Sequence, residues 1–521
     1  MRTSPTAAPA RPLLISALIL LAAVIEWTWF HLFTRIRLED ALITYRYARN
    51  LAGGVGFVYN EGERILGTTT PLYTLVLGLA GAVLGPDFIP IASNVLMAVA
   101  SAAAALLTGK ALRRLGFPEP LSWIAAASVC QNPQIVWMTC GGMETPLVLM
   151  LMAAGLWALS RGFPVLAAAA AGLLILTRID GALFAAGIYV VILLRDRRAF
   201  LRAALGGALV VAPWTVFAFV YFGTPFPHSI VAKRIIGAAD HPFGLDHAQA
   251  FVAWATPSFG AILPGAWPAG FVIFILGAVR MLRRKASPES WLVVTFPFAF
   301  SLALYLGRSP LYFDWYLAPV LYCSLIVGSA GAWSLVEGAL RLRDRLHGPA
   351  LIALGLALAT CLVMAAREMG GTAVLQRDYQ INEDGTRRAV GEWLASSTPR
   401  DAVVAMEAIG YQGYYSDRRV IDLAGLVSPQ MVRLRRQSWS NAEAFHRMLQ
   451  EMEPDYLVLR SFEVDRNVHY HGGRLFETDQ HIAYFASRYE EARRFAAPLP
   501  EVWGPTSYLT VYRRTNGTQE Q

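Results

Sequence analysis

Residues 35–71 read RIRLEDALITYRYARNLAGGVGFVYNEGERILGTTTP, and this stretch separates a first long apolar segment from the rest of the chain. It contains an acidic pair, Glu39 and Asp40, followed by tyrosines, arginines and a glycine-rich turn. Lipid solvates neither charged side chains nor the backbone of an irregular segment. We therefore expect the stretch to lie at a membrane surface or to line a polar cavity, and we take it as the candidate active-site loop.

The chain as a whole is strongly apolar. Hydrophobic residues make up 55% of its 521 residues, charged residues only 16%, and the mean hydropathy is +0.41. Apolar runs of roughly 17 to 25 residues, the length of a transmembrane helix, recur along the sequence. The net charge of +8 would suit a nucleic-acid-binding protein, but in a membrane protein an excess of arginine usually marks cytoplasmic loops. The composition predicts a membrane protein and no nucleic-acid partner.

The predicted fold class is a polytopic α-helical membrane protein with about 11 transmembrane helices. The apolar piece 72–84 is too short to span comfortably, so we expect a re-entrant or interfacial helix there, introduced by Pro71. The candidate spans are 13–33, 88–109, 121–139, 144–160, 164–177, 181–194, 201–222, 262–282, 290–306, 315–337 and 349–366.

The distribution of basic residues predicts how the chain crosses the membrane. Every even-numbered loop between the candidate spans is basic, which places the N-terminus in the cytoplasm. The outer face then carries the long loops 34–87 and 223–261 and everything after residue 366. We predict a multi-pass plasma-membrane protein with two domains, a transmembrane domain over 1–366 and a soluble extracytoplasmic α/β domain over 367–521. In the second domain we expect helices near 385–395 and 442–451 and strands near 402–406, 419–423, 456–459 and 507–512.

Ionisable residues recur in the predicted outer loops and turns. Charges at membrane depth are costly and generally face a cavity or a partner, so several on one face suggest a shared polar cavity. A carboxylate of the acidic pair could accept a proton there, although both acids could simply complement the dipole of a helix that they begin. Arg178 and Asp180 could form a structural ion pair, and Lys233 with Arg234 could bind lipid headgroups instead of a substrate phosphate. The candidate binding residues are Tyr45, Arg46, Glu144, Arg178, Asp180, His228, Lys233, Arg234 and Arg308, the last beside an aromatic run that ends at Tyr316.

Cofactor motifs are missing from the sequence. It contains no G-x-x-x-x-G-K-[ST], no G-x-G-x-x-G after a strand and no H-E-x-x-H, so ATP-driven transport, a nicotinamide enzyme and a zinc protease are unsupported. The acids could bind a divalent cation, but no ligand set with calcium-loop spacing is present. We predict no metal and no cofactor.

Several stretches resemble one superfamily. The loop EDALITYRYARNLAGGVGFVYNEGERILGTTTPLYTLVL is similar to the first outer loop of GT-C membrane glycosyltransferases, and more narrowly to the actinobacterial terminal arabinofuranosyltransferase-like and mannosyltransferase-like group. Supporting stretches are GGMETPL (141–147), LTRIDGALFA (176–185), FGTPFPHSIVAKR (222–234), WYLAPVL (315–321) and GYYSDRRVIDLAGLVSP (413–429).

This resemblance implies a transferase that uses a polyprenyl-phosphate-sugar donor on the outer face, with an acceptor glycan held in part by the tail domain. One acid of the first-loop pair would be the general base. Many relatives carry Asp at both positions, so Glu39 is a departure from the pattern, and we favour Asp40 as the base. Lys233 and Arg234 would contact the donor phosphate. Because a lipid phosphate is a good leaving group once its charge is stabilised, no general acid is required.

Two other classes of function remain as alternatives. A transporter or flippase of lipid-linked sugars also needs outer cations and aromatics, but it would more often show paired repeats and charges at mid-membrane. A non-catalytic glycan-binding or assembly protein would not need the acidic pair. An assay of sugar transfer separates all three.

Overall fold

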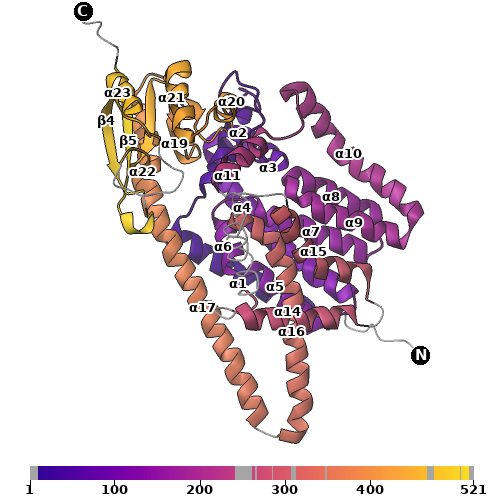
Figure 1. Ribbon diagram of the computed structural model, residues 1–521. Helices are drawn as coiled ribbons and strands as arrows, with labels where there is room; N and C mark the ends of the chain where they lie inside the picture. The colour runs from indigo at the N-terminus through magenta and orange to yellow at the C-terminus, as the bar shows by residue number, and fades with distance from the viewer. Residues whose placement is uncertain are drawn as a thin grey trace, which may run out of the picture.

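The computed structural model describes residues 10–240, 261–263, 267–283, 286–306, 313–346, 349–465, 475–504 and 506–515. A helical bundle carries an α/β unit at one end, and the chain enters that unit through one long helix that starts at the opposite end (Figure 1). The helices of the bundle are α1 (Ala10–Thr34), α4 (Ile89–Arg114), α5 (Glu119–Cys130), α6 (Pro133–Cys140), α7 (Thr145–Ser160), α8 (Pro164–Thr177), α9 (Ala182–Arg195), α10 (Arg197–Phe222), α14 (Trp267–Leu282), α15 (Pro288–Leu306), α16 (Asp314–Leu346) and α17 (Pro349–Glu383).

Shorter elements connect these helices near the α/β unit. Between α1 and α4 lie α2 (Glu39–Ala52), α3 (Pro71–Leu84) and the 3-10 turn η1 (Pro86–Phe88). The 3-10 turn η2 (Ile179–Gly181) joins α8 to α9, and α11 (His228–Asp240) follows α10. The short helix that we expected after Pro71 is α3, and proline at its first position suits a helix start because no intrahelical donor is lost there.

Five helical stretches in the described residues are long and apolar enough to cross a membrane: Leu14–Thr34, Pro86–Arg114, Arg197–Phe222, Pro288–Leu306 and Asp314–Arg341. The pair α6 and α7 would count as a sixth if it forms one span, but the two helices are bent by 118°. Helices α8, α9 and α14 fall on expected spans but have only 14 to 16 residues. The expected total of eleven spans is therefore not confirmed.

One expected span is wrong. The segment 121–139 is broken, because α5 ends at Cys130 and α6 begins only at Pro133. The side-chain oxygen of Asn132 accepts hydrogen bonds from the backbone N–H groups of Gln134 at 3.1 Å and Ile135 at 3.4 Å, so Asn132 caps a new helix. The last expected span, 349–366, is only the first part of α17, which continues to Glu383 and crosses the predicted domain boundary.

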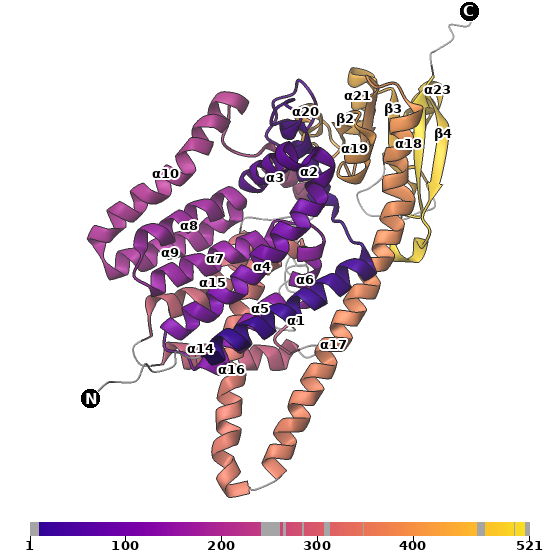
Figure 2. The ribbon, with the colours of Figure 1, turned by 180° about the vertical axis from the view of Figure 1, so that it is seen from behind.

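The α/β unit is built on a five-stranded sheet of order β2-β1-β3-β5-β4. Strand β1 pairs in parallel with β2 and β3, and β5 pairs antiparallel with β3 and β4. Seen from behind, α17 rises along the edge of the molecule and continues into α18 (Figure 2). The strands are β1 (Val403–Met406), β2 (Arg419–Asp422), β3 (Tyr456–Arg460), β4 (Tyr489–Ala496) and β5 (Tyr508–Arg514). The helical elements are η3 (Asp384–Arg388), α18 (Ala389–Ser397), α19 (Tyr411–Ser416), α20 (Pro429–Gln437), α21 (Asn441–Met452), α22 (Ser461–Val464), α23 (Asp479–Arg488) and η4 (Pro500–Val502).

All four expected strands and both expected helices of this unit are present, whereas strand β4 was not predicted. Its sequence YEEARRFA offers no apolar alternation, and most of its residues are exposed at the edge of the sheet. An edge strand with one solvated face keeps its pairing through backbone hydrogen bonds, which side-chain patterns do not reveal.

The first loop and the α/β unit share one hydrophobic cluster. Tyr47, Phe57 and Tyr59 from the first loop pack together with Val404 and Ile409 from the α/β unit. Because these side chains are buried among one another, the first loop cannot be separated from the α/β unit without exposing apolar surface. This packing fixes the surroundings of the acidic pair.

Candidate functional site

A small cavity lies where the first loop, the helical bundle and the α/β unit meet. Its volume is about 60 Å³. Residues from seven parts of the chain line it: α2, the segment after it, the α6–α7 turn, the residue that follows α8, α11, the start of α16, and a turn of the α/β unit. The lining residues are Asp40, Ile43, Thr44, Gly67, Thr68, Thr69, Thr70, Met143, Glu144, Arg178, Ser229, Lys233, Trp315, Tyr316 and Leu426.

Asp40 is the second residue of α2 and lines this cavity. An acid in the first turn is favoured by the positive end of the helix dipole. Leu38, the residue before the helix, makes no side-chain cap. The Asp40 side chain has no hydrogen bond or ion pair to any described residue. Its carboxylate is therefore available to accept a proton from a bound hydroxyl.

Glu39 has a different environment, although it is the adjacent residue. Its carboxylate accepts hydrogen bonds from the backbone N–H groups of Gly410 at 2.5 Å and Tyr411 at 3.0 Å, at the start of α19. Burial raises the pKa of Glu39, while the charge of Arg387 and the two N–H groups oppose that shift. Glu39 does not line the cavity. Its carboxylate joins α2 to the α/β unit.

Lys233, from helix α11, adds a cation to the lining of the cavity. That helix is anchored at its start, where the His228 N–H donates to the Leu66 carbonyl at 2.7 Å. The Lys233 Nζ lies 5.0 Å from the centre of the Phe313 ring, and this ring stacks on Trp315 at 4.4 Å. Lys233 forms no ion pair within the described part of the chain. Its charge is thus left for an anionic ligand.

His228 and Arg234 flank this lysine on α11 but do not line the cavity. The His228 side chain is half-buried, and its Nε2 has no hydrogen-bond partner among the described residues. Burial, and then the charge of Arg436, lower the pKa of His228. The Arg234 side chain is exposed. Arg308 lies outside the described residues.

A buried charge cluster closes one side of the cavity. Arg178 donates to Glu144 at 2.8 Å and to both carboxylate oxygens of Asp180 at 3.0 and 2.8 Å. The expected ion pair between Arg178 and Asp180 is thus present, and its bidentate geometry is a strong form of the interaction. The Arg178 guanidinium also lies 5.1 Å from the centre of the Tyr316 ring. Because two carboxylates and a ring already engage Arg178, it orients the wall of the cavity rather than offering a free cation.

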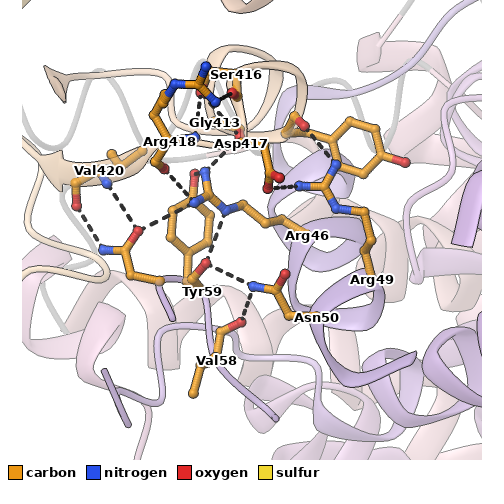
Figure 3. Close-up of polar contacts among 12 residues, drawn as sticks. Arg46, Arg49, Asn50, Val58, Tyr59, Gly413, Ser416, Asp417, Arg418 and Val420 are labelled. Atoms are coloured by element: carbon orange, nitrogen blue, oxygen red, sulfur yellow. Dashed lines mark hydrogen bonds and ion pairs between the residues drawn. The ribbon is translucent and has the colours of Figure 1, made fainter. Parts of the chain in front are cut away.

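Two candidates from the first loop are directed elsewhere. The Tyr45 hydroxyl bonds to Ser93 Oγ at 2.6 Å inside the bundle. Arg46 is buried and donates to the backbone carbonyls of Tyr59 at 3.0 Å and of Gly413 and Arg418 at 2.6 Å each, so it ties the first loop to the α/β unit (Figure 3). Both residues are buried, and neither lines the cavity. Their hydrogen bonds hold the protein together and do not face a ligand.

Several lining residues were not among the expected site residues. They include the threonines of the GTTTP segment, Ser229 and Leu426. Ser229 precedes Lys233 by four residues, so helical spacing could have placed both on one face. Leu426 comes from a turn that only the tertiary structure brings to the first loop. That turn is held by Asp422, whose carboxylate accepts from the N–H groups of Ala424 at 2.9 Å and Val427 at 3.1 Å.

Among the described residues, no group of three or more His, Cys, Asp or Glu side chains could hold a metal ion. Asp40 and Glu144 are the acids that line the cavity, and Glu144 is bonded to Arg178. The expectation that transfer needs no metal stays a prediction.

Comparisons with known proteins place the chain by its fold. The solved structure of ArnT from Cupriavidus metallidurans bound to undecaprenyl phosphate matches with a TM-score of 0.61 and 14% identity, over 95% of this chain and 97% of ArnT. The archaeal oligosaccharyltransferase AglB from Archaeoglobus fulgidus, in complex with an inhibitory peptide and a dolichol-phosphate, matches with a TM-score of 0.55 and 12% identity, over 86% of this chain and 69% of AglB. Arabinofuranosyltransferase AftD from mycobacteria matches with a TM-score of 0.48 and 16% identity, over 95% of this chain and 41% of AftD.

Sequence comparison adds one match. A family model described as a domain of unknown function (DUF8728) matches residues 375–513, which is the α/β unit with the end of α17. No curated protein matches the chain.

The chain has the fold of the GT-C membrane glycosyltransferases, and it is a multi-pass membrane protein. The sequence resemblance to this superfamily is confirmed at the level of the fold. The narrower likeness to arabinofuranosyl- and mannosyltransferases stays a prediction.

Proposed function

We propose that the protein is a glycosyltransferase that moves a sugar from a polyprenyl-phosphate-sugar donor to a hydroxyl of an acceptor glycan or glycolipid, on the extracytoplasmic face of the membrane. One observation carries the proposal. On a GT-C fold, a single cavity is lined by a carboxylate and a cation, Asp40 and Lys233, neither of which has an oppositely charged partner in the described part of the chain. These are the two charges that the reaction requires.

The chemistry follows from these charges. Asp40 accepts the proton of the acceptor hydroxyl as its oxygen forms a bond to the anomeric carbon of the donor sugar. The bond between that carbon and the phosphate oxygen breaks, and the electron pair leaves with the lipid phosphate. Lys233 stabilises the charge that develops on the phosphate. No general acid is needed, because the leaving phosphate stays ionised.

A single base that activates the acceptor directly gives inversion at the anomeric carbon. The hydroxyl attacks the face opposite the phosphate, and no covalent sugar–enzyme intermediate forms. A product with retained configuration would refute this mechanism, and analysis of the product by NMR distinguishes the two outcomes. An arabinofuranosyl or mannosyl donor is our specific expectation from the sequence resemblance.

The proposal is tested by a transfer assay with the full-length protein in lipid nanodiscs. Polyprenyl-phosphate-linked arabinofuranose and mannose are supplied with an oligosaccharide acceptor, and the extended product is detected by mass spectrometry. Wild type should extend the acceptor with one donor, and Asp40→Asn should not. Full activity of D40N would exclude Asp40 as the base. Translocation of the lipid-linked sugar without product would favour a flippase, and glycan binding without product would favour a non-catalytic role.

A further inference from the structure

Ser229 is the second residue of α11 and lines the same cavity as Lys233, four residues further on. Residues four apart lie on the same face of a helix, one turn from each other. The serine hydroxyl and the lysine ammonium are therefore presented from one helix face to one cavity.

The Ser229 side chain is buried beside the cavity. The side chain is only 3% exposed, and its Oγ has no hydrogen-bond partner among the described residues. Several serines and threonines inside other helices donate to the carbonyl four residues earlier, as Thr139 does to Ile135 at 2.6 Å and Ser329 does to Leu325 at 2.7 Å. Ser101 and Ser324 have no partner among the described residues, but neither of them lines the cavity. Ser229 lies too close to the start of α11 for this, because residue 225 precedes the helix.

The start of α11 is held in place by its neighbours. The His228 N–H donates to Leu66 at 2.7 Å, and the Ile230 N–H donates to Pro227 at 3.2 Å. The positive end of the helix dipole is at this end of α11, and it favours an anion there. A buried hydroxyl without a partner is unfavourable unless a bound ligand accepts its hydrogen bond. The hydroxyl, the helix end and Lys233 all favour the same kind of ligand, a phosphate.

We infer that Ser229 is a phosphate-binding residue, which donates a hydrogen bond from its Oγ to an oxygen of the lipid-linked phosphate that Lys233 neutralises. The inference rests on the proposed function, because the proposed function is what places the donor phosphate beside Lys233. Lys233 supplies charge without directionality, whereas the fixed hydroxyl selects the orientation of the phosphate oxygens.

Binding of farnesyl phosphate tests this inference without a turnover step. The full-length protein in nanodiscs is titrated with farnesyl phosphate, and farnesol is the probe that has the same lipid but no phosphate. We expect Ser229→Ala to weaken farnesyl phosphate binding about tenfold, the typical effect of losing one hydrogen bond to a charged group, and to leave farnesol binding unchanged. The matched control is Ser324→Ala, which removes an equally buried and unpartnered hydroxyl from α16, outside the cavity.

The outcomes distinguish the role of Ser229 from the proposed function. Weaker farnesyl phosphate binding in both Lys233→Met and S229A, with S324A at the wild-type level, supports the inference. A loss in K233M with an unchanged S229A overturns the role of Ser229 and leaves the proposed function intact. If farnesyl phosphate binds wild type no better than farnesol does, both the phosphate site and the role of Ser229 are wrong. An equal loss in S229A and S324A identifies a packing effect and also overturns the inference.

Discussion

The carboxylates of Glu39 and Asp40 are adjacent in sequence but belong to two different environments. Glu39 accepts two backbone N–H groups from the start of α19, whereas Asp40 lines the cavity and has no protein partner among the described residues. The first acid joins α2 to the α/β unit, and the second acid is free to react. The Glu39 side chain reaches the N–H groups of Gly410 and Tyr411 in the α/β unit.

The division predicts opposite consequences for two conservative substitutions. Asp40→Asn should lower kcat by about 10²- to 10⁴-fold, the usual contribution of a general base, with little change in Tm. Glu39→Gln should lower the stability by about 1–3 kcal/mol, because each carboxylate oxygen accepts one N–H and the amide NH2 that replaces one of them cannot. Its kcat should fall far less. Rates of sugar transfer and thermal unfolding curves for both variants check this, and a larger loss of kcat in E39Q would reverse the assignment.

Stability should fall as pH rises, because of a buried acid near Glu39. Burial raises the pKa of Glu383 to about 8 from an ordinary value of 4.5, against the opposing charge of Arg387. The folded state therefore keeps a proton that the unfolded chain releases between these two pH values, and the stabilisation that this proton provides is lost as pH rises toward 8. The Tm should decline from about pH 5 to about pH 8.

Glu383→Gln should flatten this decline, since the amide needs no proton. The control is Glu392→Gln, which alters an exposed ion pair with Arg388 on the same side of the unit. An unchanged slope in E383Q would show that other groups cause the pH dependence.

Arg46 should be essential for holding the α/β unit against the first loop. Arg46→Met removes the hydrogen bonds from the guanidinium to three buried backbone carbonyls, at a total cost of about 1–3 kcal/mol. The Tyr59 carbonyl still accepts from Asn50 at 3.0 Å, and the Gly413 carbonyl still accepts from the Asp417 N–H at 3.3 Å. We expect a lower Tm and faster cleavage of the α/β unit in limited proteolysis. Arg49→Met is the comparison, because Arg49 pairs with an Asp417 side chain that is 70% exposed. That change should cost only about 1 kcal/mol. Equal protease sensitivity of R46M and wild type would contradict the structural role of Arg46.

Removing the cation of the charge cluster at Arg178 should lower the stability of the protein strongly. Arg178→Met leaves the carboxylates of Glu144 and Asp180 buried without their cation, at a cost of about 3–5 kcal/mol. The matched change is Arg280→Met, which breaks a partly exposed pair with Glu337 and should cost about 1 kcal/mol or less. Thermal unfolding in the same detergent measures both. Similar shifts in Tm would mean that burial does not strengthen the cluster.

The sequence identified four strands and two helices of the α/β unit because these elements carry a local pattern. The parallel strands β1 and β3 are short apolar runs, and α21 has apolar residues at helical spacing. Strand β4 was missed because its pairing is made by backbone groups of an exposed edge. The break between α5 and α6 was missed because a window of mean hydropathy averages over a single capping residue, Asn132.

Some residues of the candidate site could also be selected from the sequence, and others could not. Asp40, Lys233, Glu144 and Arg178 could be selected from the sequence because charged residues beside apolar spans are costly and hence conspicuous. Ser229, the threonines and Leu426 are ordinary residues in loops and turns, and only their convergence on one cavity distinguishes them. Tyr45 and Arg46 looked equally functional, but their hydrogen bonds inside the protein engage them.

The sequence by itself determined that this chain is a helical membrane protein, that charged groups gather in its first loop, and that an α/β unit follows the last apolar stretch. Those properties depend on composition and on patterns within about 20 residues. Only the tertiary structure decided which acid faces the cavity and which joins α2 to the α/β unit. That choice depends on where residues some 370 positions away present their N–H groups, and no local pattern encodes such a distance.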